Sequence, residues 1–174
     1  MLKLDNCFII KDNCPIFVES LRVMKTYKTI SQKLPALNEA LAEYVTQSSG
    51  ISQDFSKFSF SDFIEDKIMV IKSIRRGISF KLFKAILSFS PFTDEEWAEY
   101  LNISSKSLQR YRKTKDFHFK PIHSEKILEI AEVTAFGKEV FQDNAQFYNW
   151  LNTPSLALNH LTPAELLKDS YGKE

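Results

Sequence analysis

Residues 93–113 read TDEEWAEYLNISSKSLQRYRK, and this stretch decides the fold class. Thr93 and Glu96 have the spacing of a capping box, in which a hydroxyl and a carboxylate accept hydrogen bonds from free amides at a helix start. The apolar residues that follow have the spacing of two short helices joined by a tight turn at Asn102–Ser104: Trp97, Ala98, Leu101, Ile103, Leu108 and Tyr111. The sequence therefore predicts a helix-turn-helix.

The two predicted helices differ in charge. Four acidic residues lie in the first helix, whereas residues 104–115 contain five basic residues and no acidic one. With Leu108 and Tyr111 facing inward, the outer face of the second helix is rich in hydrogen-bond donors. Gln109 and Arg110 are suited to pair with base edges, and the remaining basic residues are suited to neutralise phosphates. The candidate DNA-binding residues are Ser105, Lys106, Gln109, Arg110, Arg112 and Lys113.

An ordinary helical hairpin with a solvated basic face accounts for the same pattern. The motif is short, and basic surface helices are common in proteins that bind no nucleic acid. Lys and Arg total 23 against 22 acidic residues, so the net charge of the whole chain favours neither interpretation.

Helical patterns also precede this stretch. Apolar residues recur at helical spacing from Leu34 to Val45, before a polar stop at Gln47–Gly50. A second pattern runs from Phe63 to Ile74 and ends at Gly77, since glycine suits the left-handed conformation that closes a helix. A third helix is predicted from Phe80 to Phe89. Residues 8–18 fit either a short hairpin or the start of a helix.

Three further helices are predicted downstream, at residues 124–141, 143–151 and 163–168. Gly137 leaves open a kink or a break in the first of them, and Pro163 suits a first helical turn, where its missing amide proton costs nothing. Four glycines and six prolines in 174 residues are too few for the repeated turns of sandwiches and barrels. The predicted fold class is all-α.

Composition excludes several other classes of protein. Cys7 and Cys14 lie close together without the histidines or second cysteine pair of a zinc site, and they imply no disulfide framework. No apolar run approaches the roughly 18 residues that span a bilayer. We therefore expect a soluble protein of the reducing cytoplasm that makes no contact with a membrane.

Candidate catalytic groups are sparse. His118, His123 and His160 share no metal-ligand spacing. Glu125 and Glu129 lie four residues apart on one predicted helix, where a solvated face explains them better than a carboxylate pair. The sequence contains no glycine-rich phosphate-binding motif. We expect no enzyme, no catalytic residue, no metal and no cofactor.

The C-terminal third carries a more specific pattern. From Trp150 to Gly172 the sequence reads WLNTPSLALNHLTPAELLKDSYG, with Trp-Leu, Thr-Pro, Ala-Leu and Pro-x-x-Leu-Leu steps in order. Together with ISSKSLQR at Ile103–Arg110, this stretch resembles the antitoxins of the Xre, MbcA and ParS family, from about Ser61 to Gly172. The sequence has Asn159-His160 where that family usually has a glycine-containing turn, and asparagine tolerates positive φ.

The resemblance implies one half of a type II toxin-antitoxin pair. It implies that the C-terminal domain binds a RES-domain toxin and obstructs its NAD site, while the helix-turn-helix binds operator DNA and represses the shared operon. RES toxins are similar to ADP-ribosyltransferases, so the NAD chemistry belongs to the partner. The expected division is residues 1–60 as an extension of unknown role, 61–115 as the helix-turn-helix region and 116–174 as the toxin-binding domain.

Two kinds of residue share the C-terminal segment. Its apolar residues are explained first as a small core: Trp150, Pro154, Leu158, Leu161, Leu166 and Leu167. Loops and chain ends reach most readily into a cleft. The candidate toxin-binding residues are therefore polar or terminal: Asn152, Asn159, His160, Lys168, Tyr171 and Lys173.

Two alternatives to the antitoxin function fit the sequence. One is a stand-alone transcription regulator whose C-terminal domain serves dimerisation, and the other is a protein-interaction module whose helix-turn-helix binds no DNA. A homodimer is expected because two-fold DNA readers place two recognition helices about one helical turn apart. The apolar side of Phe63–Ile74 is a candidate dimer surface.

Overall fold

The computed structural model describes residues 35–49, 58–141 and 143–169, and the regular elements in these ranges are all helical. The predicted all-α class is confirmed, while the candidate hairpin at residues 8–18 lies outside the described ranges. In chain order the elements are α2 (Pro35–Ser49), α3 (Phe60–Glu65), α4 (Lys67–Arg76), α5 (Phe80–Phe89), α6 (Asp94–Tyr100), α7 (Ser105–Lys113), α8 (Pro121–Val140), α9 (Asn144–Leu151), the 3₁₀ turn η1 (Leu156–Leu158) and α10 (Pro163–Leu166).

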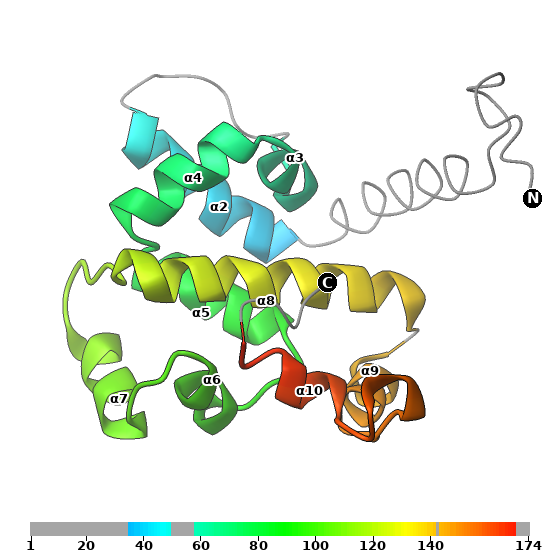
Figure 1. Ribbon diagram of the computed structural model, residues 1–174. Helices are drawn as coiled ribbons and strands as arrows, with labels where there is room; N and C mark the ends of the chain where they lie inside the picture. The colour runs from blue at the N-terminus through cyan, green and yellow to red at the C-terminus, as the bar shows by residue number, and fades with distance from the viewer. Residues whose placement is uncertain (1–34, 50–57, 142, 170–174) are drawn as a thin grey trace, which may run out of the picture.

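The long helix α8 is the element around which the others are arranged (Figure 1). α4 and α5 pack against it, α2 packs against α3 and α5, and α9 packs against α8. Figure 1 shows α2, α3 and α4 on one side of α8 and α6, α7, α9 and α10 on the other. One hydrophobic core runs through these contacts, with buried side chains from residues as far apart as Leu37 and Leu167. None of the helices in the described ranges is both long and apolar enough to cross a bilayer.

The helix predicted from Phe63 to Ile74 is two helices, and the prediction of one continuous helix is wrong. α3 begins at a capping box of Ser59 and Asp62, and the chain leaves the helical conformation at Asp66. The Asp66 carboxylate then accepts a hydrogen bond from the Met69 amide and starts α4. Apolar periodicity does not reveal the break, because apolar residues continue from α3 into α4.

Gly77 ends α4 as predicted. Its φ is +96°, and its amide donates to the carbonyls of Ser73 and Ile74. A Cβ at this position would lie 2.3 Å from the Phe119 carbonyl oxygen, so the close approach of the two backbones also requires glycine.

A short backbone pairing next to Gly77 ties α5 to the segment that follows α7. The Phe80 amide donates to the Phe117 carbonyl at 2.8 Å, and the Phe119 amide donates to the Ile78 carbonyl at 2.9 Å. This pairing has no signal in the sequence, because the two paired segments are too short to show a periodicity. It anchors the end of the helix-turn-helix to the core.

The C-terminal helices follow the predictions with shifted ends. α8 begins at Pro121, three residues earlier than predicted, because proline is itself a favourable first residue, and it continues through Gly137 without a break. Asp143 caps α9, accepting from the Gln146 amide at 2.7 Å. α10 is shorter than predicted and ends at Leu166, although Pro163 does occupy its first turn.

Candidate DNA and toxin interfaces

The helix-turn-helix is built on a buried tryptophan. Trp97 is fully buried, and its indole Nε1 donates to the Ser90 hydroxyl at 2.8 Å. The predicted capping box is present: the Thr93 amide donates to the Glu96 carboxylate at 2.7 Å, and the Glu96 amide donates to the Thr93 hydroxyl at 3.2 Å. Both bonds satisfy amides that α6 itself leaves free, so they fix the start of the helix.

The turn between α6 and α7 depends on a residue with positive φ. Asn102 has φ +51°, a conformation that asparagine tolerates better than most residues. The Ile103 amide then donates to the Ala98 carbonyl at 2.9 Å, and Ser104 caps α7 by accepting from the Ser107 amide at 3.1 Å. Ala98 is buried beneath the turn, where its small side chain allows the two helices to approach closely.

The predicted inner and outer faces of α7 are both present. Leu108 is buried, and Tyr111 is half-buried with its ring stacked on Phe117 at a centroid distance of 4.0 Å. The side chains of all the candidate DNA-binding residues are exposed on the outer face: Ser105, Lys106, Gln109, Arg110, Arg112 and Lys113.

Arg112 already has an ionic partner within the chain. Its guanidinium lies 2.6 Å from the Asp94 carboxylate at the start of α6. The Arg110 guanidinium lies over the neighbouring Tyr111 ring, 5.6 Å from its centroid. Neither contact buries the charge, so both side chains remain accessible to a phosphate or a base edge.

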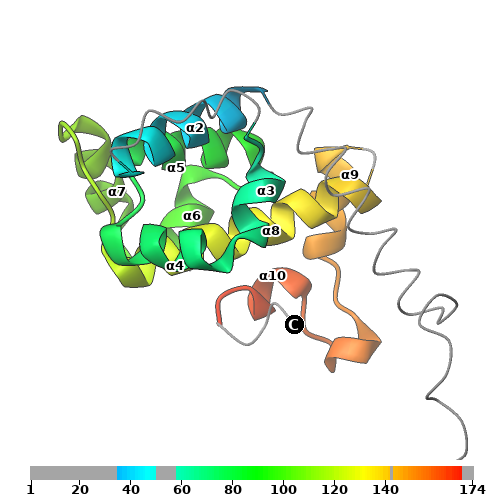
Figure 2. The same ribbon diagram turned by 90° about the horizontal axis from the view of Figure 1, so that it is seen from above.

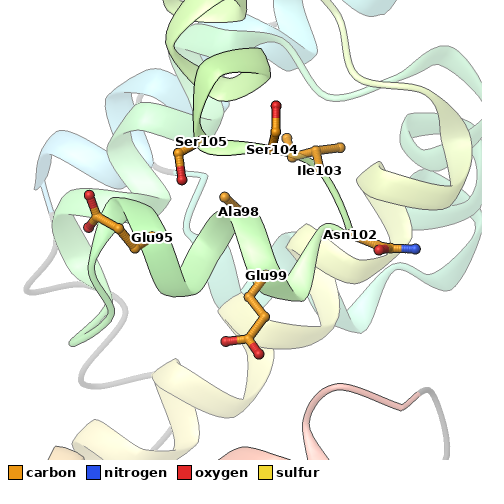
Figure 3. A pocket seen from close by; sticks show the side chains of 7 residues that line it. All are labelled: Glu95, Ala98, Glu99, Asn102, Ile103, Ser104 and Ser105. Carbon is orange, nitrogen blue, oxygen red and sulfur yellow. The ribbon is translucent and has the colours of Figure 1, made fainter.

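An open, shallow hollow lies beside the turn (Figure 3). Glu95, Ala98 and Glu99 contribute to it from α6, residues 102–104 contribute from the turn, and Ser105 contributes from the start of α7. Its two carboxylates make this side of the motif unfavourable for phosphate. The side suited to nucleic acid is therefore the outer face of α7.

The C-terminal segment keeps several apolar residues out of the core. Leu167 is buried in the core as predicted, while Leu158 and Leu166 are only half-buried. Trp150, Pro154 and Leu161 are exposed, so the core prediction is wrong for these three. Trp150 lies within α9 and stacks on the buried Phe147 ring with one face toward solvent. The chain after α9 closes into a loop of its own, which leaves Pro154 and Leu161 outside the core.

The structure describes four of the six candidate toxin-binding residues, and all four are exposed: Asn152, Asn159, His160 and Lys168. Asn159 and His160 have φ of +54° and +66°, so this pair reverses the chain through two consecutive residues of positive φ. The Asn152 amide nitrogen donates to the Tyr148 carbonyl at 2.9 Å. Tyr171 and Lys173 lie outside the described residues.

Two contacts join the C-terminal segment to α6. The Tyr148 hydroxyl donates to the Glu96 carboxylate at 2.9 Å, and this hydrogen bond raises the pKa of Tyr148. The Lys168 ammonium lies 2.6 Å from the Glu99 carboxylate, which raises the pKa of Lys168. Neither contact has a signal in the sequence, since the partners are 52 and 69 residues apart. Lys168 therefore has a structural partner besides any toxin.

Candidate catalytic groups remain scattered over the described residues. No three His, Cys, Asp or Glu side chains there are arranged to hold a metal ion. His123 is half-buried, and burial lowers its pKa. Glu129 is not on a solvated face as predicted: it forms an ion pair of 2.8 Å with Lys126, and both side chains are nearly buried. The reason is that Lys126 also donates to the Leu167 carbonyl, under the chain that leaves α10.

Comparison with known families gives two matches, in the order that the sequence predicted. Residues 69–132 match the antitoxin Xre-like helix-turn-helix domain, and residues 137–173 match the antitoxin Xre/MbcA/ParS C-terminal toxin-binding domain. No curated protein sequence gives a significant match. The first range contains α6 and α7, and the second contains α9, η1 and α10. The chain therefore belongs to the Xre/MbcA/ParS family of toxin-antitoxin antitoxins.

Proposed function

We propose that this antitoxin binds and blocks a RES-domain toxin that consumes NAD, and that it represses its own operon through its helix-turn-helix. The observation that carries the proposal is the presence of both matched regions, in order, on one chain. Antitoxins of this kind are regulatory binding proteins, and the NAD chemistry lies entirely on the partner. The chain itself supplies two binding surfaces and no catalysis.

The proposed DNA surface is the outer face of α7. Its candidates Ser105, Lys106, Gln109, Arg110, Arg112 and Lys113 are all exposed. Binding that depends on phosphate neutralisation weakens steeply as the salt concentration rises, because the release of counterions from DNA becomes less favourable. A homodimer would present two such helices to a two-fold operator. Of the apolar face suggested for dimerisation, Ile68 and Ile71 are exposed on α4, whereas Phe63 and Ile64 are buried in the chain's own core.

The proposed toxin surface lies in the C-terminal segment. Its exposed candidates Asn152, Asn159, His160 and Lys168 lie in the loop after α9 and just beyond α10. Tyr171 and Lys173, close to the last residue, complete the proposed contact set. Exposed side chains on a loop and near a chain end are suited to enter the NAD cleft of a partner.

The toxin half is tested by co-expressing the chain with the RES-domain protein encoded beside it and purifying through a tag on one partner. Co-purification with suppressed NAD consumption supports the proposal. A toxin that consumes NAD at full rate in the presence of excess antitoxin, without forming a complex, contradicts it.

The DNA half is tested separately with an operon-promoter reporter. The double variant Lys106→Glu and Arg110→Glu should relieve repression, because it reverses two charges on the outer face of α7. Lys84→Glu is the matched control, since Lys84 is an exposed lysine on α5, outside α6 and α7. Equal repression by the wild type, the double variant and the control would show that repression does not depend on the outer face of α7.

A further inference from the structure

The loop from Ser155 to Leu161 is held in shape by its own backbone. The Ser155 amide donates to the Leu161 carbonyl at 3.1 Å, and the His160 amide donates to the Ser155 carbonyl at 2.9 Å. Within this closure the Leu158 amide donates to the Ser155 carbonyl and forms the 3₁₀ turn. Two consecutive residues of positive φ, Asn159 and His160, reverse the chain. The loop therefore keeps its shape without packing against the core.

This rigid loop presents a leucine to solvent. Leu156 is 81% exposed, the highest value among the exposed large hydrophobic residues of the described chain, and Ala157 beside it is also exposed. Figure 2 shows the orange η1 turn at the edge of the molecule, away from α2 and α5. Leu156 contributes nothing to the chain's own core, so its side chain is available for burial by a partner.

The stretch of sequence around Leu156 is free of charged residues. Residues 144–164 contain no Asp, Glu, Lys or Arg, although these types make up 26% of the whole chain. The centres of protein interfaces are depleted of charged residues in the same way. Exposed Trp150 and Leu161 lie in this uncharged segment as well. The segment falls within the matched toxin-binding region, which identifies the class of partner.

We infer that the Ser155–Leu161 loop is the anchor of the antitoxin on its toxin, with Leu156 inserting into an apolar pocket on the toxin. The inference rests on the proposed function and specifies its chemistry: the main contact is an apolar side chain on a preformed loop, and the polar candidates surround it. A loop that is already ordered loses little conformational entropy on binding, which favours affinity.

The test is the affinity of the full-length chain for the RES-domain protein encoded beside it. Leu156→Asp should weaken the affinity by at least about tenfold, as expected for a central interface residue, while Leu156→Met should retain it. Ile122→Asp is the matched control: Ile122 is 72% exposed but lies on α8 outside the toxin-binding region, and its substitution should leave the affinity unchanged. Circular dichroism verifies that each variant is folded.

A second pair of variants tests the preformed shape of the loop. Asn159→Gly and Asn159→Val both remove the candidate contact of the Asn159 side chain, but only valine opposes positive φ. Asn159→Val should therefore bind more weakly than Asn159→Gly, with little change in the melting temperature. Wild-type affinity for both Leu156→Asp and Asn159→Val overturns the inference and leaves the proposed function intact. A wild-type chain that binds no RES-domain protein overturns the proposed function and this inference with it.

Discussion

Gly137 is the residue at which α9 packs directly on the backbone of α8. A Cβ built at this position would lie 2.3 Å from the ring of Phe147, which is buried. Glycine normally weakens a helix interior, so its presence here reflects the contact and not a kink. We predict that Gly137→Ala destabilises the fold by about 1–3 kcal/mol, the usual range for overpacking. Chemical denaturation measures the change, and a stabilised variant would contradict the contact.

Asn102 is the exposed residue at which the turn of the helix-turn-helix requires positive φ. Its φ of +51° is open to glycine and asparagine and unfavourable for branched side chains. Asn102→Gly should therefore change stability little, while Asn102→Val should lower it by about 1–3 kcal/mol. The comparison of the two thermal midpoints separates backbone conformation from lost side-chain contacts, because both variants remove the amide group. Equal midpoints would show that the turn does not require positive φ.

Glu139 makes the stability of the fold dependent on pH. One of its carboxylate oxygens is buried without a hydrogen-bond partner among the described residues, and burial raises its pKa to about 7. Between its ordinary pKa of 4.5 and about 7, the folded chain holds a proton that the unfolded chain releases. The contribution of Glu139 to the free energy of unfolding is therefore fully present below that pH window, where the carboxyl group is protonated. It is lost as the pH rises through the window.

The variant Glu139→Gln stays neutral at every pH, so it should melt like the wild type at pH 4.5 and at a higher temperature at pH 8. Glu125→Gln is the control, because Glu125 is an exposed glutamate on the same helix. Melting curves of the three proteins across this pH range provide the measurement. A Glu139→Gln variant that gains no stability at pH 8 would show that the carboxylate is well solvated.

At the scale of elements, α6 restrains the recognition helix α7. The Asp94 carboxylate at the start of α6 holds the Arg112 guanidinium, and a DNA phosphate has to compete with it for the same donors. Asp94→Asn removes the competing charge and should raise the affinity for operator DNA several-fold at low salt. Fluorescence anisotropy at two salt concentrations measures this, and the gain should shrink at high salt because exposed charges are screened. Weaker binding by the variant would mean that Asp94 instead positions Arg112 for DNA.

The elements that the sequence predicted well are those with both a cap and a periodicity. Thr93 and Glu96 define the start of α6, Gly77 defines the end of α4, and both lie where expected. The break at Asp66 was missed because a capping aspartate inside an apolar pattern resembles a solvated helix residue. A capping residue therefore locates a helix end reliably only where the apolar pattern also stops.

The candidate site was predictable only in part, for a related reason. The exposure of the α7 side chains follows from the helical spacing of Leu108 and Tyr111. The exposure of Leu156 does not, because leucine is among the residue types that are most often buried. Its position depends on backbone hydrogen bonds within the loop and on two residues of positive φ. Neither feature has a periodicity that a sequence reveals.

At the scale of the molecule, the two matched regions share one core. α8 runs from the first matched range into the second, Phe147 packs on Gly137, and Tyr148 and Lys168 contact carboxylates of α6. A chain joined in this way should unfold as a single cooperative unit. The alternative is a C-terminal segment that melts first and leaves the helix-turn-helix folded.

The two tryptophans of the sequence separate these outcomes, because Trp97 lies in the helix-turn-helix and Trp150 lies in α9. In a Trp150→Phe background, fluorescence reports on Trp97 alone. Phe147→Ala empties a buried site in α9 and should cost about 3–5 kcal/mol. If the core is shared, the free energy of unfolding reported by Trp97 falls by this full cost, and its denaturation midpoint falls with it. Phe136→Ala, at a half-exposed phenylalanine on α8, should change both little. An unchanged Trp97 midpoint in Phe147→Ala would mean that the toxin-binding segment folds on its own, and that a bound toxin has no route through the core to the DNA-binding helix.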